Sequence, residues 1–406
     1  MDKQTDPVRR RLLAGSAGML AAGFANTASA QGAAPAAPAT PAEARPLPPY
    51  VAWKNPANVI VHTATTIETK RSAYGTSVIT PADRLYIRNN LPAPDVAIVA
   101  DRDAWALSVE GVKSPATLTV RELKSMGLQT VATVLQCSGN GRGYFPTQPS
   151  GTKWQVGAAG CVIWSGVPVK TVVAALGGIA GDARFITGTG GEKLPDGIDP
   201  LSVVVERSVP LSNLDDALLA WEMNGDALPH AHGGPLRLIV PGYSGVNNIK
   251  YIKRLAFTPG ETQAAIQKTG YRISPPGQKG DPGFPAVWEM DVKSWINGPA
   301  PESGAVKAGW VQVHGVAMGG MNAVRRVDVS VDGGQTWREA RFVGPDLGRF
   351  AWRQFVLPVK LEPGIHVLAS RAQDSKFNWQ SETTPDNAGG YLYSGWRAHA
   401  VRVTVA

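Results

Sequence analysis

The stretch that decides how this chain folds is Leu135-Gln136-Cys137-Ser138-Gly139-Asn140-Gly141-Arg142. An apolar run, Val131 to Leu135, predicts a short buried strand with Cys137 at its end. The small residues that follow leave the sulfur accessible, and the nearby Arg142 favours the thiolate, which is the form that binds metals and attacks substrates. This pattern predicts a soft ligand for a redox metal or a cysteine nucleophile, although most lone cysteines are inert core residues.

The segments around this strand, from about residue 50 to 260, mix short apolar runs with turns. They predict an α+β fold without the regular strand and helix alternation of nucleotide-binding folds. The expected helices are Val120 to Met126 and Val169 to Leu176. The expected strands are Val96 to Val99, Thr130 to Leu135, Val203 to Val205 and Leu236 to Val240. Gly188 to Gly191 is expected to be a turn. His230 and His232 lie two apart and would share a face if they lay in a strand, but the pair is expected to be structural or loop-exposed rather than a metal site.

The sequence changes character after a loop rich in proline and glycine, Ser274 to Gly283. From about Val287 onward, apolar and polar residues alternate in short runs, which is typical of strands. Asp332-Gly333-Gly334 lies between two such runs and predicts a hairpin turn. About seven short strands over roughly 115 residues predict a β-sandwich of immunoglobulin type.

The first 30 residues predict an export signal. Arg9, Arg10 and Arg11 precede a weakly apolar run, Leu12 to Phe24, and Ala28-Ser29-Ala30 fits a cleavage site. The paired arginines favour the twin-arginine route, which exports folded proteins, over an ordinary secretory signal. Residues 31–48 are rich in alanine and proline and predict a linker. We expect a periplasmic protein whose mature chain neither spans a membrane nor binds nucleic acid.

The composition excludes several classes of protein. The chain has 406 residues, a formal net charge of +8, and 43% hydrophobic and 18% charged residues, which is typical of a folded protein of two or three domains. Two cysteines cannot form a disulfide framework or a four-thiolate metal site. The sequence has no Cys-x-x-Cys-His motif for attaching a haem, no His-Glu-x-x-His motif and no phosphate-binding loop motif.

An ordered set of motifs resembles the sulfite oxidase family. The cysteine stretch is preceded by Ile87-Arg88-Asn89-Asn90-Leu91-Pro92 and followed by Trp154-x-x-Gly157-Ala158, Trp164-Ser165-Gly166-Val167, Glu222-Met223-Asn224-Gly225, His232-Gly233-Gly234-Pro235-Leu236-Arg237, Val240-Pro241-Gly242 and Ile249-Lys250-Tyr251-Ile252. In the second half, Arg326 to Trp337 is similar to the family's dimerisation domain. The resemblance implies a molybdopterin-binding catalytic domain over residues 49–283 and an immunoglobulin-like dimerisation domain over residues 284–406.

The resemblance also implies roles for particular residues. In this family one molybdopterin and one protein cysteine hold the molybdenum, and that cysteine corresponds to Cys137. The positions that hold the cofactor correspond to Asn89, Asn90, His232, Arg237 and Lys250. The positions of the substrate pocket correspond to Arg88, Arg142, Trp154, Tyr271 and Arg402. Several family members have histidine where this chain has Asn90, and asparagine cannot carry a proton at neutral pH. Cys161 is expected to be a small core residue.

The implied activity is oxidation of sulfite to sulfate at one molybdenum–molybdopterin centre per chain, in a homodimer. Because the chain has no haem-attachment motif, the electrons would pass to a separate acceptor such as a c-type cytochrome. Two alternatives use the same cofactor, namely reduction of a sulfoxide and reduction of nitrate. A third alternative, from a different class, is a non-catalytic binding protein whose sandwich contacts a partner.

Overall fold

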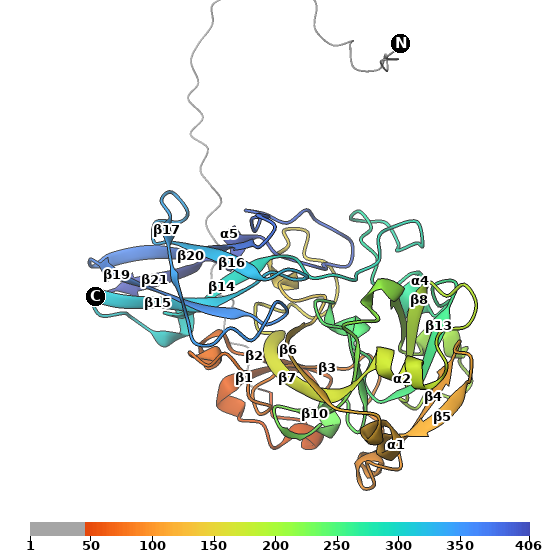
Figure 1. The fold of residues 1–406 in the computed structure, drawn as a ribbon. Coiled ribbons are helices and arrows are strands. Elements are labelled where there is room, and N and C mark those ends of the chain that lie inside the picture. The colour runs from red at the N-terminus through yellow and green to blue at the C-terminus, as the bar shows by residue number, and fades with distance from the viewer. Residues whose placement is uncertain (1–44) are drawn as a thin grey trace, which may run out of the picture. The chain divides into compact units, whose positions relative to one another are not determined.

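The computed structural model describes residues 45–406, so the predicted export signal and residues 31–44 of the predicted linker lie outside it. These residues belong to one compact unit, in which an α+β region is followed by a β-sandwich (Figure 1). The predicted fold class is confirmed, and the domain boundary after residue 283 stays a prediction. Within residues 45–406, no helix has the length and apolar character needed to cross a membrane.

Three sheets build the α+β region. The sheet that leads to Cys137 has the order β11 (Asp226–Ala227), β10 (Leu218–Met223), β7 (Ala159–Pro168) and β6 (Gln129–Gln136), with β12 (Arg237–Ile239) also paired to β10. The second has the order β5 (Ala116–Thr119), β4 (Ala106–Glu110), β13 (Ile252–Thr258), β8 (Phe185–Gly190) and β9 (Glu206–Pro210). The third joins β1 (Val59–Thr63), β2 (Thr66–Thr69) and β3 (Ile87–Arg88).

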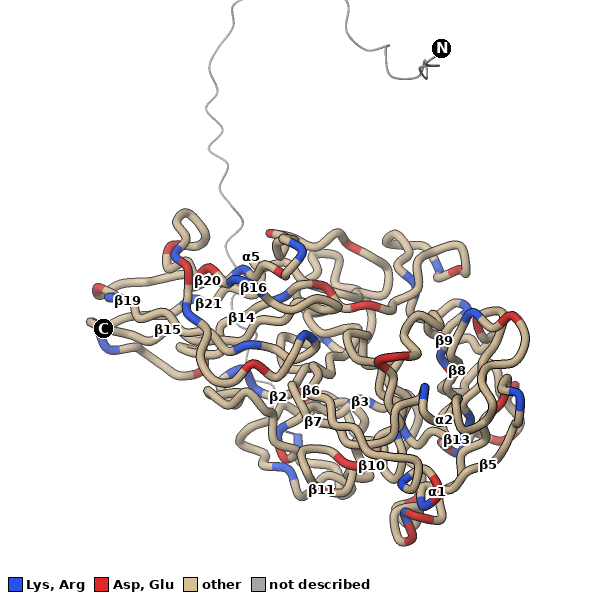
Figure 2. Tube along the Cα trace, viewed as in Figure 1, with Lys and Arg blue, Asp and Glu red and all other residues tan. Residues whose placement is uncertain are grey.

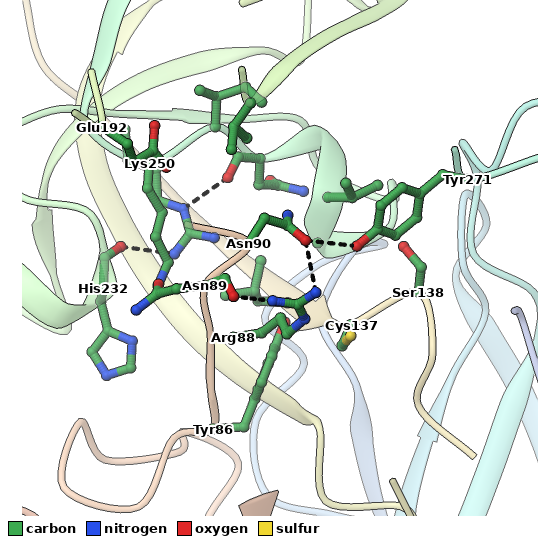
Figure 3. Close-up of a pocket in the computed structure, with 17 residues that line it drawn as sticks. Tyr86, Arg88, Asn89, Asn90, Cys137, Ser138, Glu192, His232, Lys250 and Tyr271 are labelled. Atoms are coloured by element: carbon green, nitrogen blue, oxygen red, sulfur yellow. Dashed lines mark hydrogen bonds between the residues drawn. The ribbon is translucent and has the colours of Figure 1, made fainter. Parts of the chain in front are cut away.

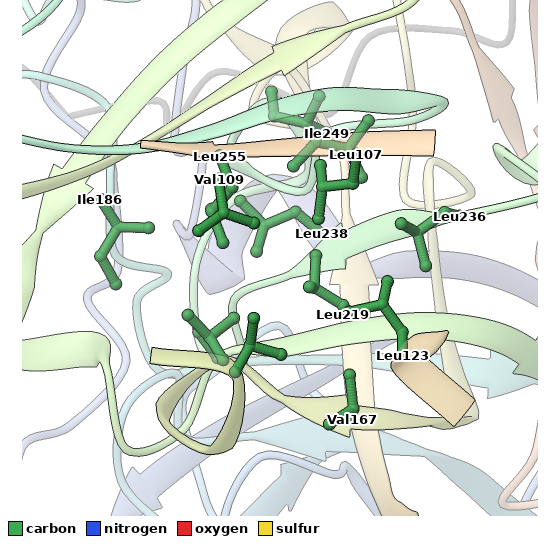
Figure 4. Close-up of a cluster of buried hydrophobic side chains, with 14 of the residues drawn as sticks. Leu107, Val109, Leu123, Val167, Ile186, Leu219, Leu236, Leu238, Ile249 and Leu255 are labelled. Carbon is green, nitrogen blue, oxygen red and sulfur yellow. The ribbon is translucent and has the colours of Figure 1, made fainter. Parts of the chain in front are cut away.

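A buried apolar cluster joins the two larger sheets (Figure 4). Leu107 and Leu255 enter it from β4 and β13, and Val167 and Leu219 enter it from β7 and β10. Each of these four side chains is fully buried, so the cluster removes a large apolar area from water and fixes the two sheets against each other. The strands that carry the candidate site residues are therefore held on a rigid support.

Both predicted helices are confirmed. Helix α1 (Val120–Ser125) begins at a capping box, in which the Thr119 side chain accepts from the Glu122 backbone and the Glu122 side chain accepts from the Thr119 backbone. Helix α2 (Val169–Ala175) buries Val169, Val172 and Val173, whose spacing places them on one helical face. The short helices α3 (Pro200–Val203), α4 (Ala265–Lys268) and α5 (Trp396–His399) are single turns.

The sandwich has eight strands in two four-stranded sheets. One sheet has the order β14 (Lys293–Gly298), β15 (Gly309–Met318), β19 (Arg353–Leu361) and β18 (Arg341–Val343), and the other β17 (Arg338–Glu339), β16 (Val324–Ser330), β20 (Gly364–Asp374) and β21 (Val401–Val405). The predicted hairpin turn connects β16 to β17. Burial alone would raise the pKa of Asp332 in this turn, but hydrogen bonds from Ser330, Thr336 and Gln335 lower it to about 2.

The sandwich lies directly against the strand that leads to Cys137. The backbone N–H of Val134 in β6 donates to the carbonyl of Phe350 at 2.8 Å. Arg71 donates to the carbonyl of Ile296 at 2.7 Å and to the carbonyl of His399 at 3.2 Å. These bonds connect the two halves behind β6, so residues of the sandwich are close to the cysteine stretch.

Three local predictions, two strands and one turn, are wrong. Val96–Val99 is a 3-10 helix rather than a strand, because the Asp95 side chain caps it and Val96 is 65% exposed. Val203 ends helix α3, and the next strand begins only at Glu206. His230–His232 is also a 3-10 helix. The predicted glycine turn belongs largely to strand β8, where a Cβ on Gly188 would approach the Leu238 side chain to 3.0 Å.

Candidate active site

A pocket opens where β3, the end of β6 and the start of β13 meet (Figure 3). It brings together most of the predicted site residues, although they come from distant parts of the chain. Those on the pocket wall are Arg88, Asn89, Asn90, Cys137, His232, Arg237, Lys250 and Tyr271. Tyr86, Ser138 and Glu192 also line it.

Cys137 lies on this wall in a tightly held turn, with 7% of its surface exposed. Its backbone N–H donates to the Ala158 carbonyl at 2.8 Å, and its carbonyl accepts from the Asn140 N–H at 2.9 Å. The Asn140 side chain adds a bond to Gln136 at 2.9 Å and one from the Ala158 N–H at 3.1 Å. A Cβ on Gly139 would lie 2.5 Å from the Arg142 guanidinium, so a larger residue there would displace that side chain.

Cys161 has the opposite environment, as predicted. It lies in the middle of β7, opposite Val134 of β6, and its side chain is fully buried in an apolar cluster. Burial raises the pKa of its thiol to about 12, so at neutral pH it stays protonated and behaves as a small apolar side chain. Of the two thiols, Cys137 is the one on the pocket wall.

The inner end of the pocket gathers cationic side chains. Lys250 donates to the Asn89 side chain at 2.6 Å and to the Ala231 carbonyl at 2.7 Å. Arg237 donates to the His232 carbonyl at 2.8 Å. Lys54 lies nearby and donates to the carbonyls of Ala82 and Leu85. Within residues 45–406, none of these three cations has an ion-pair partner within 4.0 Å.

Burial and mutual repulsion disturb the ionisation of this group. Burial, together with the charge of Arg237, holds the pKa of Lys250 well below its usual value. Burial lowers the pKa of Arg237 to about 10 and that of Lys54 to about 7. Burial, with the charge of Lys54, keeps the pKa of His232 well below its usual value, so this imidazole is neutral at pH 7. An anion bound among these groups would relieve the repulsion.

Several buried polar atoms of the pocket residues have no hydrogen-bond partner among the described residues. They are Asn89 Nδ2, Ser138 Oγ, Glu192 Oε2 and His232 Nε2. Buried polar atoms are normally paired, because leaving one unpaired costs about 1–3 kcal/mol. One wall thus carries unpaired donors and acceptors, unneutralised cations and one thiol. This set fits a polar, anionic cofactor whose metal binds a thiolate. The residues present therefore fit a molybdopterin.

The mouth of the pocket is organised around Asn90. The Asn90 side-chain oxygen accepts from Arg88 Nη2 at 2.7 Å and from the Tyr271 hydroxyl at 3.3 Å. Arg88 also donates to the Asn89 carbonyl. The Asn90 side chain thus holds the guanidinium of Arg88 in place and makes a longer contact with the Tyr271 hydroxyl.

Three of the predicted residues do not line the pocket. Arg142 is not among its lining residues and donates to the carbonyls of Gly389 at 3.0 Å and Thr152 at 3.3 Å. Trp154 is fully buried behind the wall, where its ring contacts those of Tyr86 and His62. Arg402 is an exposed residue of β21, paired to Val367. A place in the pocket for Arg402 is not supported, because adjacent strand residues point to opposite faces and Arg402 lies on the outer face.

Tyr271 has one aromatic neighbour, Tyr391, and one cationic neighbour, Arg207, that the sequence did not predict. Tyr391, from the sandwich half, stacks on Tyr271 with ring centroids 4.9 Å apart, and Arg142 lies 5.4 Å from the Tyr391 ring. Arg207 is fully buried with its guanidinium 5.6 Å from the Tyr271 ring, and burial lowers its pKa to about 9. The signal that could have found Arg207 is an arginine within the apolar pattern of β9.

Comparison with known proteins identifies both halves. Residues 92–266 match the model of an oxidoreductase molybdopterin binding domain, and residues 285–405 match a Mo-co oxidoreductase dimerisation domain. Sulfite oxidase from Gallus gallus is 33% identical over 339 residues, which cover 78% of this chain and 72% of that protein. Nitrate reductase from Hordeum vulgare is 30% identical, and the match covers 78% of this chain but 38% of that protein.

A solved structure shows the same fold. The crystal structure of the sulfane dehydrogenase SoxCD from Paracoccus pantotrophus superposes with a TM-score of 0.71 and 25% identity, covering 85% of this chain and 88% of that one. Cys137, Glu192, His232, Arg237 and Lys250 of the pocket lie within the range that matches the molybdopterin-binding model, and Arg88, Asn89, Asn90 and Tyr271 lie just outside it. The chain therefore belongs to the sulfite oxidase family of molybdenum oxidoreductases.

Proposed function

We propose that this chain is a periplasmic sulfite dehydrogenase that oxidises sulfite to sulfate and passes electrons to a separate acceptor. The observation that carries the proposal is a single pocket that combines the Cys137 thiol with Arg88 at its mouth and unneutralised cations at its inner end. The similarity to sulfite oxidases supports sulfite as the substrate. The balanced reaction converts sulfite and water into sulfate, two protons and two electrons.

The inner end of the pocket would hold the cofactor. Cys137 would provide the protein's thiolate ligand, and Lys250 and Arg237 would neutralise the cofactor phosphate, since fixed cationic donors bind phosphate well. The unpaired nitrogens of Asn89 and His232 would donate to or accept from the pterin. When bound, this cofactor supplies oxygen-atom transfer and takes up two electrons.

The mouth of the pocket would bind the substrate anion. Arg88 carries a planar guanidinium that Asn90 holds in place, so it needs little reordering to bind an oxyanion. Tyr271 makes only a long hydrogen bond to Asn90, 3.3 Å, so its hydroxyl is free to turn toward the bound anion. Because Asn90 cannot carry a proton, we expect proton release to depend on Tyr271 and solvent.

The partners follow from the other parts of the chain. The predicted twin-arginine signal supports a periplasmic location, and the dimerisation-domain match supports a homodimer of about 80 kDa, twice the mature chain. Basic and acidic residues are interspersed along the described part of the trace, residues 45–406 (Figure 2). A c-type cytochrome is the natural class of acceptor outside the cytoplasm.

Lysines in place of Arg9, Arg10 and Arg11 should retain the protein in the cytoplasm, which cell fractionation would measure.

Two other substrates have specific support. The structural likeness to a sulfane dehydrogenase favours a sulfane as a second candidate. The sequence likeness to a nitrate reductase favours nitrate as a third, and a pocket arginine suits that anion too. Reduction of a sulfoxide at the same site remains an alternative on chemical grounds.

A panel of steady-state assays separates these candidates. The purified protein should reduce ferricyanide or cytochrome c with sulfite, and should show much lower activity with sulfane sulfur, or with nitrate or a sulfoxide and a reduced dye. A higher kcat/KM for any other substrate than for sulfite would overturn the proposal. Arg88→Met should raise the KM for the true substrate, which ties the activity to this pocket.

A further inference from the structure

A buried lysine of the sandwich reaches the turn that carries Cys137. Lys293, the first residue of β14, is 1% exposed. Its ammonium makes one hydrogen bond within the described residues, to the carbonyl of Asn140 at 3.4 Å. No carboxylate of residues 45–406 lies within 4.0 Å of it. An ammonium has three donors, so this buried charge is poorly compensated.

The groups around Lys293 show what could compensate it. The Trp295 ring centroid lies 5.8 Å from its nitrogen. Burial keeps the pKa of His399 well below its usual value, so that neighbouring imidazole is neutral and supplies no negative charge. The charge of Asp291 acts most strongly on the ammonium, although the two form no ion pair, and the sulfur of Cys137 is the next group to act on it.

The contact with Asn140 is specific to the cysteine turn. Asn140 donates its backbone N–H to the Cys137 carbonyl at 2.9 Å, and its side chain bonds to Gln136. The carbonyl that Lys293 meets is therefore part of the same closed turn as the sulfur. A charge held against this turn acts on Cys137 through a medium from which water is largely excluded, where electrostatic interactions are strong.

We propose that Lys293 is the counter-charge of the Cys137 thiolate, supplied by the sandwich to the metal-binding turn. Lys293 is a positioning residue: it does not touch the substrate, but it stabilises the anionic sulfur and lowers its electron donation to the metal. It therefore raises the reduction potential of the centre. The inference rests on the proposed role of Cys137 as the metal ligand.

The first test compares Lys293→Gln and Lys293→Arg with wild-type holoprotein at equal molybdenum content. Lys360→Gln is the matched control, because Lys360 is an exposed strand lysine of the same sandwich, 3.3 Å from Glu362. Lys293→Gln should lower the reduction potential of the centre by about 59 mV for a one-electron step. At a fixed solution potential this raises the ratio of oxidised to reduced centre about tenfold. Lys293→Arg keeps the positive charge, so its reduction potential should stay close to the wild-type value. A Lys293→Gln potential equal to that of Lys360→Gln would overturn the proposal.

The second test is a double-mutant cycle that needs no redox measurement. Lys293→Met should lower the Tm when Cys137 is present, because the thiolate loses its partner. In a Cys137→Ser background the same substitution should raise the Tm, because it removes a buried charge that has lost its anion. An equal change in Tm in both backgrounds, or failure of the double variant to fold, would show a purely structural lysine. Absence of molybdenum from the wild-type protein would instead overturn the proposed function.

Discussion

Two cations of the sandwich, Arg326 and Arg371, differ from the cations of the pocket in what neutralises them. In the sandwich, the buried carboxylate of Asp328 accepts from Arg326 at 2.7 Å and from Arg371 at 3.1 Å. In the pocket, Arg237 and Lys250 have no carboxylate within 4.0 Å among the described residues. Pairing offsets the cost of burying a charge, whereas unpaired buried charges destabilise a fold unless a ligand supplies the anion. The difference marks the pocket as a binding site.

The largest expected effect contrasts the two cysteines. Cys137→Ser replaces a soft thiolate by a hard, weak ligand, and sulfite turnover should fall more than about a hundredfold while the fold is kept. Cys161→Ser should keep most of the turnover, because Cys161 only packs in the core. Steady-state kinetics and circular dichroism measure both effects. Near-normal turnover in a molybdenum-loaded Cys137→Ser protein would remove Cys137 from the site.

The next prediction contrasts an arginine of the pocket with one of the sandwich. Arg88→Met removes a charge-assisted hydrogen bond worth roughly 1.5–3 kcal/mol, so the KM for sulfite should rise about ten- to a hundredfold. Arg142→Met should have a smaller effect, because Arg142 acts through Tyr391. Arg371→Met should lower the Tm and leave KM unchanged, since it leaves Asp328 short of a partner. Equal KM values in all three variants would place the substrate elsewhere.

A third prediction uses the pH dependence of stability. Burial lowers the folded-state pKa of Lys54 to about 7, below the unfolded value of 10.5. The unfolded state therefore binds more protons between these values, and stability rises with pH. In cofactor-free protein, the wild type should gain up to about 1.4 kcal/mol per pH unit relative to Lys54→Met above pH 7. Urea unfolding from pH 7 to 9 tests this, and parallel curves for the two proteins would contradict it.

The smallest expected effect is in the sandwich turn. The folded-state pKa of Asp332 is about 2 and lies below its usual 3.8, so the carboxylate stabilises the fold above pH 4 and this contribution is lost as pH falls toward 2. Asp332→Asn should cost about 1 kcal/mol at pH 7, after allowance for solvent screening. The cost should vanish at pH 2. A cost that does not depend on pH would show that the hydrogen bonds, and not the charge, hold the turn.

Local features of the fold were predictable from the sequence. The apolar run before Cys137 is a strand, Thr119 and Glu122 cap a helix, and Asp332-Gly333-Gly334 turns a hairpin. Each depends on residues that are neighbours in the chain. Val96–Val99 shows the limit, because its apolar composition favours a strand, yet the Asp95 cap and the lack of a buried face produce a 3-10 helix.

The parts of the site that escaped prediction are brought in from far along the chain. Tyr391 stacks on Tyr271, although 120 positions of sequence separate the two residues. Lys293 bonds to Asn140, although 153 positions separate those two. No local pattern marks such residues, because their role depends on how the sandwich packs against the α+β region. Arg142 and Trp154 illustrate the converse, since motif similarity predicted pocket residues, whereas Arg142 bonds to the Gly389 carbonyl outside the pocket lining and Trp154 is fully buried.

The central claim is that this pocket holds a molybdenum centre that sulfite reduces. The most direct measurement is the molybdenum content of the purified wild-type protein, together with the absorption or paramagnetic-resonance change of the centre on anaerobic addition of sulfite. The account predicts about one molybdenum per chain and rapid reduction by sulfite, both abolished or strongly reduced in Cys137→Ser. A protein that lacks molybdenum, or a loaded centre that sulfite does not reduce, would contradict it.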